Sequence, residues 1–223
     1  WMKICENWRK KYPQVLNIWR KQKKFTNPYY FIEILSEELN NKDIIIADDG
    51  AHLTWAVQAF KIKKGQNFFS AFGNSPMGYA LPASIGASIA KNNQRIICID
   101  GDGSLQINLQ ELHTLYHNKL PIKIFILNNN GYGIIKQFQE LYLSKRFEAS
   151  AVEKGVTNPN YKKIAYAFNI NYTEIKDHKN LRKKIKKIIN SRKAEFVNVF
   201  VKPDQKIVPK LQFGKPIEDL SPL

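Results

Sequence analysis

The tetrapeptide Gly101-Asp102-Gly103-Ser104 combines two glycines with a carboxylate and a hydroxyl. It lies between an apolar run, residues 95–100, and a stretch with helically spaced leucines, residues 105–117. We therefore expect a strand to lead into it and a helix to leave it. Glycines let the backbone approach a ligand closely, and the first N–H groups of a helix favour phosphate. A carboxylate beside a bound phosphate is favourable when a divalent cation lies between them. Alone, such a short motif is more often an ordinary turn.

A second polar stretch, Asn128-Asn129-Asn130-Gly131, follows the apolar run 121–127. Asn129 lies 27 residues after Asp102, which leaves room for one helix and one strand. A right-handed crossover would place the two loops side by side at one edge of a sheet. The Asn129 side-chain oxygen and a backbone carbonyl near Gly131 would then complete a hard-cation site beside Asp102. The alternative is that an Asn-Gly turn only ends a strand.

The elements that must position these loops alternate between short apolar runs and helical patterns. We expect strands at 43–47, 95–100, 121–127 and 196–201, and helices at 30–39, 79–90, 105–117, 161–168 and 180–191. This order predicts an α/β fold with a parallel sheet flanked by helices on both faces. Ligands bind such sheets at the carboxyl ends of the strands. We divide the chain into a linker or helix at 1–26, a binding domain at 27–202 and an extended tail at 203–223.

Composition narrows the class of protein. The 223 residues are 43% hydrophobic and carry a net charge of +16, so nucleic-acid binding is one interpretation. The lysines are spread along the chain, and the pattern of residues 180–191 predicts a helix with a solvated basic face, so we do not expect a nucleic-acid partner. No apolar run is long enough to cross a membrane, so we do not expect a membrane span. Two cysteines favour a reducing compartment, and we expect a cytoplasmic protein. A start at Trp1 leads us to expect the tail of a longer polypeptide.

The spacing of Gly101–Ser104 and Asn128-Asn129 resembles the signature of thiamine diphosphate enzymes. The residues of the motif are most similar to those of acetolactate synthase-like members. The resemblance extends over most of the chain. It includes Asp48-Asp49-Gly50-Ala51-His52 with Trp55, the stretch from Gly73 to Ala83, Gln137-Phe138-Gln139-Glu140, and the tail from Pro209 to Pro222. It implies the thiamine diphosphate-binding fold and the C-terminal, diphosphate-binding domain of a three-domain chain.

The resemblance also implies roles for particular residues. Thiamine diphosphate would be bound by Gly50, Ala51, His52, Ser75, Met77, Gly101, Gly103, Ser104, Asn129, Gly131 and Tyr132, and Mg²⁺ by Asp102, Asn129 and the carbonyl of Gly131. Ser75 would offer its carbonyl to the aminopyrimidine, and Met77 would be the apolar wedge that bends the cofactor. The alternatives are that Met77 is a core residue and that His52 lies on the surface.

Departures from the family's pattern concern the substrate. Phe138 stands where acetolactate synthases have Trp, and Ile134 or Ile135 where the family has Met, so Phe138 and Ile134 are candidates for the substrate pocket. The family's activating glutamate belongs to another domain, normally of a neighbouring subunit, so we assign no catalytic residue within this chain. The resemblance leaves open whether FAD binds, because the family's flavin contacts lie mostly upstream.

Together these features predict a thiamine diphosphate- and Mg²⁺-dependent transferase or lyase. It would be a carboligase that decarboxylates a pyruvate-like 2-keto acid and transfers the acyl carbanion equivalent to a carbonyl acceptor. A 2-keto acid or acyl-CoA decarboxylase, or a non-catalytic regulatory paralogue, are the alternatives. The shared site implies a partner subunit or domain that supplies the pyrimidine half, and hence a homo-oligomer, a dimer or tetramer.

Overall fold

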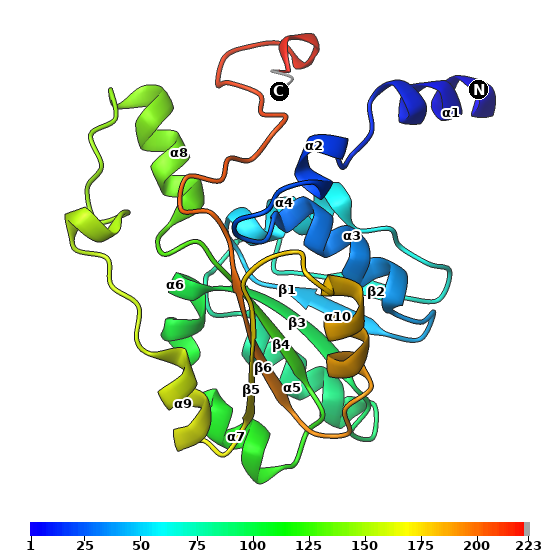
Figure 1. The fold of residues 1–223 in the computed structure, drawn as a ribbon, viewed down its shortest axis with the longest axis vertical. Coiled ribbons are helices and arrows are strands. Elements are labelled where there is room, and N and C mark those ends of the chain that lie inside the picture. The colour runs from blue at the N-terminus through cyan, green and yellow to red at the C-terminus, as the bar shows by residue number, and fades with distance from the viewer. Residues whose placement is uncertain (221–223) are drawn as a thin grey trace.

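A six-stranded parallel sheet forms the centre of the computed structural model, which describes residues 1–220 (Figure 1). The strand order is β2-β1-β3-β4-β6-β5, and every neighbouring pair is parallel. The strands are β1 (Ile44–Ala47), β2 (Asn67–Phe69), β3 (Ile96–Gly101), β4 (Lys123–Asn128), β5 (Asn171–Ile175) and β6 (Glu195–Phe200). The predicted α/β fold is therefore confirmed, and β1, β3 and β4 are neighbours.

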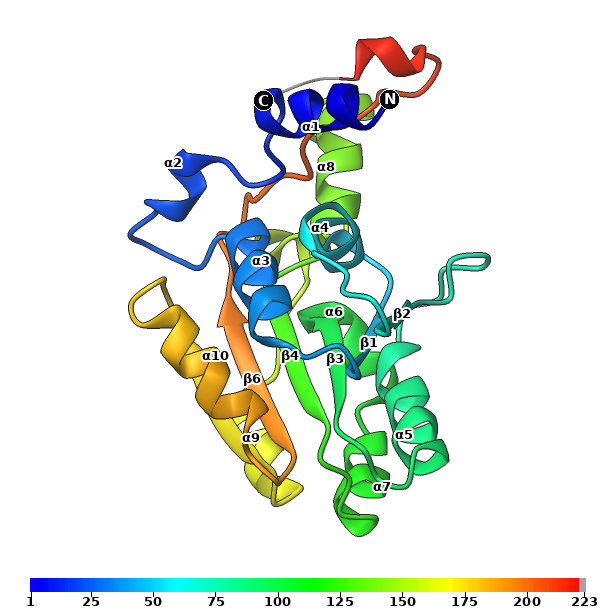
Figure 2. The ribbon, with the colours of Figure 1, turned by 90° about the vertical axis from the view of Figure 1, so that its right-hand side faces the viewer.

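The sheet has a separate hydrophobic core on each face, because successive side chains of a strand point to opposite sides. One core packs under α3 (Pro28–Glu38), α4 (Ala51–Ala59) and α10 (Leu181–Ile189). The other packs under α5 (Ala80–Ala90), α7 (Glu111–His117) and α9 (Tyr161–Ala167). Figure 2 shows the two helical layers on either side of the strands. With both faces covered, β3 is buried along its whole length, which explains the apolar run Ile96–Ile99 at its start.

The basic stretch of α10 is a surface helix, as its pattern predicts. Leu181, Ile185, Ile188 and Ile189 are buried against the sheet. Of the lysines between them, Lys183, Lys186 and Lys187 are exposed. The charge run is therefore the solvated face of an amphipathic helix. No helix within residues 1–220 is long and apolar enough to cross a membrane.

The single helix predicted for residues 105–117 is wrong. The structure has α6 (Asp102–Leu105), a 3₁₀ turn (Gln106–Asn108) and then α7. The Asn108 amide donates to the Gly78 carbonyl at 2.7 Å, and Gln106 and Tyr161 both donate side-chain hydrogen bonds to the Asp102 carbonyl. The bonds from Asn108 and Tyr161 join segments far apart in the chain, whereas the bond from Gln106 is local. Together they compete with regular helix geometry, which sequence spacing does not reveal.

Two strands and one long helix were not predicted. Strand β2 is only three residues long, and β5 is a polar edge strand, so neither has the apolar run that marks a buried strand. Helix α8 (Gly133–Tyr142) extends away from the sheet beyond the end of β4 (Figures 1 and 2).

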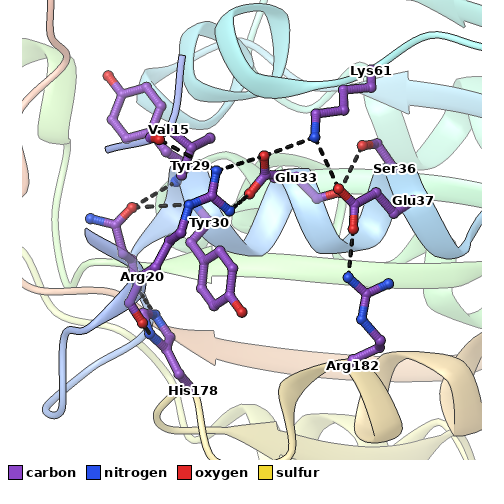
Figure 3. Close-up of polar contacts among 11 residues, drawn as sticks. Val15, Arg20, Tyr29, Tyr30, Glu33, Ser36, Glu37, Lys61, His178 and Arg182 are labelled. Carbon is purple, nitrogen blue, oxygen red and sulfur yellow. Dashed lines mark hydrogen bonds and ion pairs between the residues drawn. The ribbon is translucent and has the colours of Figure 1, made fainter. Parts of the chain in front are cut away.

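A chain of ion pairs joins the N-terminal segment to the body of the fold (Figure 3). This segment contains α1 (Met2–Lys11), which has no buried residue, and α2 (Asn17–Arg20). Arg20 forms two hydrogen bonds to the buried Glu33 of α3, Lys61 bridges Glu33 and Glu37, and Arg182 of α10 reaches Glu37. The segment is thus fixed to α3 and, through α3, to α10.

The C-terminal segment consists of irregular coil and turns and crosses between helices of the body. Gln137 exchanges two hydrogen bonds with the backbone of Ile207, at 2.9 and 2.8 Å, and the Tyr29 hydroxyl does the same with Val208. Residues 217–219 form one 3₁₀ turn, Ile217–Asp219. The remainder of the predicted tail, residues 221–223, lies outside the described part of the chain.

Candidate functional site

Three neighbouring strand ends meet at one small cavity of about 90 Å³. The loop after β1, the turn after β3 and the loop after β4 supply most of its wall. It is lined by Asp49, Gly50, Ala51, His52, Trp55, Met77, Gly101, Asp102, Gly103, Ser104, Leu127, Asn129, Gly131, Tyr132, Gly133, Ile134 and Ile135. Because β1, β3 and β4 lie side by side and parallel, their carboxyl ends bring these loops together.

The cavity contains most of the residues singled out from the sequence. Those present are Gly50, Ala51, His52, Met77, Gly101, Asp102, Gly103, Ser104, Asn129, Gly131, Tyr132 and Ile134; those outside it are Ser75 and Phe138. The expected adjacency of the two polar loops is confirmed, since β3 pairs with β4. Which ligand these residues contact stays a prediction.

Asp102 is the buried acid of the cavity, with 2% of its surface exposed. Its Oδ2 accepts hydrogen bonds from the Gly131 N–H at 3.0 Å and from the Asn158 amide at 2.6 Å. Burial raises the pKa of Asp102 to about 6, although these hydrogen bonds oppose the shift. A carboxylate held in such a place is costly by itself, and a cation beside it would offset that cost.

Asn129 faces the same cavity from the end of β4 and is also buried. Its Nδ2 has no hydrogen-bond partner among the described residues. The side chain packs closely over Gly133, where an added Cβ would stand 2.4 Å from Nδ2. A buried amide with an unmet hydrogen-bonding group is what a ligand at this point would satisfy.

Glycines line the cavity where any side chain would collide with a neighbour. A Cβ on Gly103 would lie 2.3 Å from the Tyr132 ring, and a Cβ on Gly101 would lie 2.7 Å from the His52 ring. On Gly131 it would lie 2.7 Å from the Ser150 carbonyl oxygen. The backbone at the strand ends is therefore open to a ligand on one side and tightly packed on the other.

His52 is buried at the cavity wall, so the alternative of a surface histidine is wrong. Burial lowers the pKa of His52 to about 3, and its Nε2 has no partner among the described residues. The imidazole is therefore neutral at physiological pH and offers a ring nitrogen, not a positive charge, to the cavity.

Met77 is 38% exposed and lines the cavity, so the alternative of a core methionine is wrong. The backbone directly after it is anchored by Asp48, whose carboxylate accepts from the N–H groups of Gly78 at 2.9 Å and Ala80 at 2.6 Å. Asp48 thus fixes where the Met77 loop meets the cavity.

Ser75 and Phe138 lie outside the cavity wall. Ser75 is in the exposed loop that precedes Met77, with a positive φ of 46°. Phe138 lies on the outer part of α8, where its ring packs against Tyr142 and Phe213. A role for either residue therefore requires a ligand that extends beyond the cavity.

Several residues at the site were not anticipated. Asn158 reaches Asp102 from a loop more than fifty positions away, and Asp48 anchors the Met77 loop. Asn158 precedes Pro159 and so looks like an ordinary turn residue, with no spacing signal that links it to Asp102. Asp48 directly follows an apolar run, and an acid at the end of a predicted strand is a pattern by which it could have been found.

Asp48, His52 and Asp100 form a second group of buried potential ligands, with ligand atoms within 4.8 Å of one another. Three backbone N–H groups already bind the Asp48 carboxylate. Burial is the main cause that raises the pKa of Asp100 well above its ordinary value, and the negative charge of the nearby Asp48 adds to it. We therefore interpret this group as a support beneath the cavity, in which burial favours the protonated form of Asp100.

The donor chemistry of the cavity fits a hard divalent cation. Carboxylate, amide and backbone carbonyl oxygens are the ligands that Mg²⁺ takes in proteins, together with phosphate oxygens. A volume of about 90 Å³ is far below the roughly 300–1,000 Å³ of sites that enclose a drug-sized molecule. This chain can therefore enclose one end of a larger ligand, such as a diphosphate, and leave the rest outside the cavity.

Comparison with protein families gives one match over most of the sheet. Residues 48–199 match the model of the thiamine pyrophosphate enzyme, C-terminal TPP binding domain. The matched range contains every predicted site residue.

Individual relatives agree with this match. The chain is 35% identical to the acetolactate synthase large subunit of Cyanidium caldarium and 31% identical to that of Porphyra purpurea, each over 96% of this chain. It is 30% identical over 77% of its length to the acetolactate synthase isozyme 2 large subunit of Escherichia coli (strain K12). The matched regions cover 36%, 35% and 31% of these relatives, so the chain spans about a third of their length.

Proposed function

The chain belongs to the thiamine pyrophosphate enzyme family, by its C-terminal TPP binding domain, and we propose that it forms the diphosphate- and magnesium-binding half of an acetolactate synthase-like carboligase. One observation carries this proposal. Three adjacent strand ends enclose a cavity that combines the buried acid Asp102, the unsatisfied amide of Asn129 and a glycine-lined backbone.

Each group at the cavity has a role in this proposal. Asp102 and Asn129, through side-chain oxygens, and Gly131, through its carbonyl, would hold Mg²⁺ against the cofactor's diphosphate. Gly103 and Ser104 would contact the diphosphate itself, and neutral His52 would border it without adding charge. Met77, half-exposed at the rim, would support the bent cofactor where it leaves the cavity. When bound, thiamine diphosphate supplies an electron sink for decarboxylation.

We propose a pyruvate-like 2-keto acid as the substrate and transfer of its acyl unit to a carbonyl acceptor. The names of the three relatives above support this choice, because each is an acetolactate synthase. Ile134 lies at the cavity wall and Phe138 one helical turn further out on α8. The two side chains would therefore border the substrate outside the diphosphate site.

The site enclosed by this chain is half of what the proposed reaction needs. The cavity takes only the diphosphate end, so a second domain or subunit would supply the pyrimidine half and the activating glutamate. A homo-oligomer follows if that half comes from another copy. In this arrangement residues 27–202 form the binding unit, and the segments before and after it connect the unit to its partner.

Product analysis tests the proposed reaction. The full-length protein with thiamine diphosphate, Mg²⁺ and pyruvate should release carbon dioxide and form a condensation product such as acetolactate. The Asp102→Ala variant should lose this activity, whereas Asp204→Ala, which removes an exposed acid that pairs with Lys202, should retain it. Release of an aldehyde without condensation would indicate a decarboxylase. Cofactor binding with no turnover of any 2-keto acid would indicate a non-catalytic relative.

A further inference from the structure

Asn158 is the one side chain outside the cavity loops that contacts the carboxylate of Asp102 in the described part of the chain. It lies between the 3₁₀ turn Val152–Lys154 and helix α9. Its Nδ2 donates to Asp102 Oδ2 at 2.6 Å and to Asn130 Oδ1 at 3.1 Å. Both N–H groups of the amide are therefore used at the strand ends, one on each of the two polar loops.

The orientation of the Asn158 amide is fixed from its other side. Gln106 Nε2 donates to Asn158 Oδ1 at 3.2 Å. An asparagine amide has one acceptor oxygen and one donor nitrogen, so a donor at Oδ1 obliges Nδ2 to face the carboxylate. Gln106 Nε2 also donates to the Asp102 carbonyl at 3.2 Å. Gln106 thus selects the orientation in which Asn158 is a donor to Asp102.

The consequence for Asp102 is that one of its two oxygens is already occupied. Oδ2 accepts from Asn158 and from the Gly131 N–H, which uses both of its lone pairs. Oδ1 is then the oxygen with lone pairs to offer a cation. The Tyr161 hydroxyl donates to the Asp102 carbonyl at 2.5 Å, so residues 158–161 hold both the side chain and the backbone of Asp102.

From this geometry we propose that Asn158 is a positioning residue for the divalent cation: it holds the Asp102 carboxylate so that a single oxygen is presented, and Gln106 orients the Asn158 amide for that task. The proposal rests on the proposed function, since it assigns Asp102 to the cation. Side chains that orient a metal ligand through hydrogen bonds commonly change metal affinity by about 10–100-fold when removed.

Manganese, which can replace magnesium and is visible by electron paramagnetic resonance, provides the test. In the full-length protein with thiamine diphosphate, Asn158→Ala should raise the Kd for Mn²⁺ about 10–100-fold. At saturating cation, the affinity for thiamine diphosphate should return to that of the wild type, because only the cation site is weakened. A purely structural loss would not be restored by excess cation.

Asn160→Ala is the matched control. Asn160 is the same residue type two positions along the same loop, and it caps α9 by accepting from the Lys163 N–H at 3.1 Å. Its loss should lower thermal stability and leave the Mn²⁺ Kd within about twofold of wild type, because it has no bond to Asp102. Gln106→Ala provides a second variant if Asn158→Ala does not fold, and it should weaken Mn²⁺ binding in the same direction by a smaller factor.

The outcomes separate this inference from the proposed function. If the wild type binds Mn²⁺ and both Asn158→Ala and Gln106→Ala bind it equally well, the positioning role is wrong and the proposed function stands. If the wild type binds no Mn²⁺ with thiamine diphosphate, both are wrong. A loss of affinity in Asn160→Ala equal to that in Asn158→Ala would also overturn the positioning role, because it would make the effect one of loop stability.

Discussion

Close packing at single residues gives the cavity its shape, and Gly103 is the tightest case. A Cβ at this position would lie 2.3 Å from Cε1 of the Tyr132 ring. We expect Gly103→Ala to lower the free energy of unfolding by about 1–3 kcal/mol, as overpacking does, and to weaken binding at the cavity. Denaturant unfolding measures the first effect and titration with thiamine diphosphate the second.

A second substitution identifies the cause of the Gly103→Ala effect. If the Tyr132 ring is responsible, adding Tyr132→Ala should recover part of the stability, so the double variant should be more stable than the two single losses predict. Gly86→Ala in α5 is the control, since a Cβ there meets nothing within 4 Å. Additive losses for Gly103→Ala and Tyr132→Ala would contradict the proposed collision.

The buried imidazole of His52 makes a prediction about pH. Burial lowers its pKa to about 3 in the folded protein, against about 6.5 in the unfolded chain. The unfolded state therefore binds the proton more readily. The stability that depends on a neutral His52 is complete above about pH 6.5 and is lost as the pH falls toward 3.

A comparison with His52→Gln isolates this contribution. The difference in unfolding free energy between wild type and variant, without ligands, should shrink by about 1.6 kcal/mol from pH 6.5 to pH 5, because the slope rises from about 0.7 to about 1.4 kcal/mol per pH unit as the unfolded imidazole becomes protonated. Urea unfolding at the two pH values measures it. The comparison cancels the opposite trend from Asp102, whose pKa is raised. A difference that is constant with pH would show that His52 is not held neutral by the fold.

The sequence was sufficient to predict which loops meet at the cavity, but not every residue that lies there. The Gly-Asp-Gly turn and the Asn-Asn turn predicted adjacent loops because strand order and crossover rules place consecutive parallel strands side by side. Asn158 and Asp48 act through hydrogen bonds between segments far apart in the chain, and no local pattern encodes those bonds. Ser75 and Phe138 lie outside the cavity, in places that a ligand larger than the cavity would have to reach.

Among the secondary-structure elements, α2 and α3 are joined by the stacked rings of Trp19 and Tyr29 and by Arg20, which bonds to one buried acid, Glu33. Burial alone would raise the pKa of Glu33, but hydrogen bonds from Arg20 and Lys61 outweigh it and hold the pKa below its ordinary value. We expect Glu33→Gln to lower the free energy of unfolding by about 1.5–3 kcal/mol, the range for hydrogen bonds to charged groups. Thermal or urea unfolding at pH 7 measures it.

Glu37→Gln is the control for Glu33, because Glu37 joins the same chain of ion pairs from a more exposed position (Figure 3). Its loss should cost less than about 1 kcal/mol, as for surface pairs. The Glu33 contribution should also disappear in acid, as the pH falls below about 4.3 and through the lowered pKa of the folded state. Equal losses for the two variants would contradict a special role for burial.

Helices and strands were predicted correctly where the local pattern of apolar residues is strong. The buried strands β1, β3, β4 and β6 and the amphipathic α10 have periodicities that burial imposes directly. The segment 105–117 has helical spacing too, yet it is divided where Asn108 bonds to the Gly78 carbonyl and Tyr161 bonds to the Asp102 carbonyl just before it. Tertiary contacts therefore override periodicity where the chain passes the site.

In the molecule as a whole, α8 and the C-terminal segment extend from the carboxyl end of the sheet (Figure 2), and the loops that line the cavity lie at that same end. The apolar side chains of Ile135, Phe138 and Leu141 are exposed on α8. The proposed pyrimidine half of the site would have to meet the cavity from this side. Part of the net charge of +16 lies on the basic face of α10, which is directed to solvent on one flank of the sheet.

Calorimetric titration of the full-length protein with thiamine diphosphate tests the central claim most directly. With Mg²⁺ present the wild type should bind, and a chelator should abolish binding. Asp102→Ala should weaken binding by more than about 100-fold, since even the loss of a residue that only orients a metal ligand costs about 10–100-fold. Asp204→Ala should bind as the wild type does. Equal affinity with and without Mg²⁺, or in Asp102→Ala and wild type, would contradict a cation held at these strand ends.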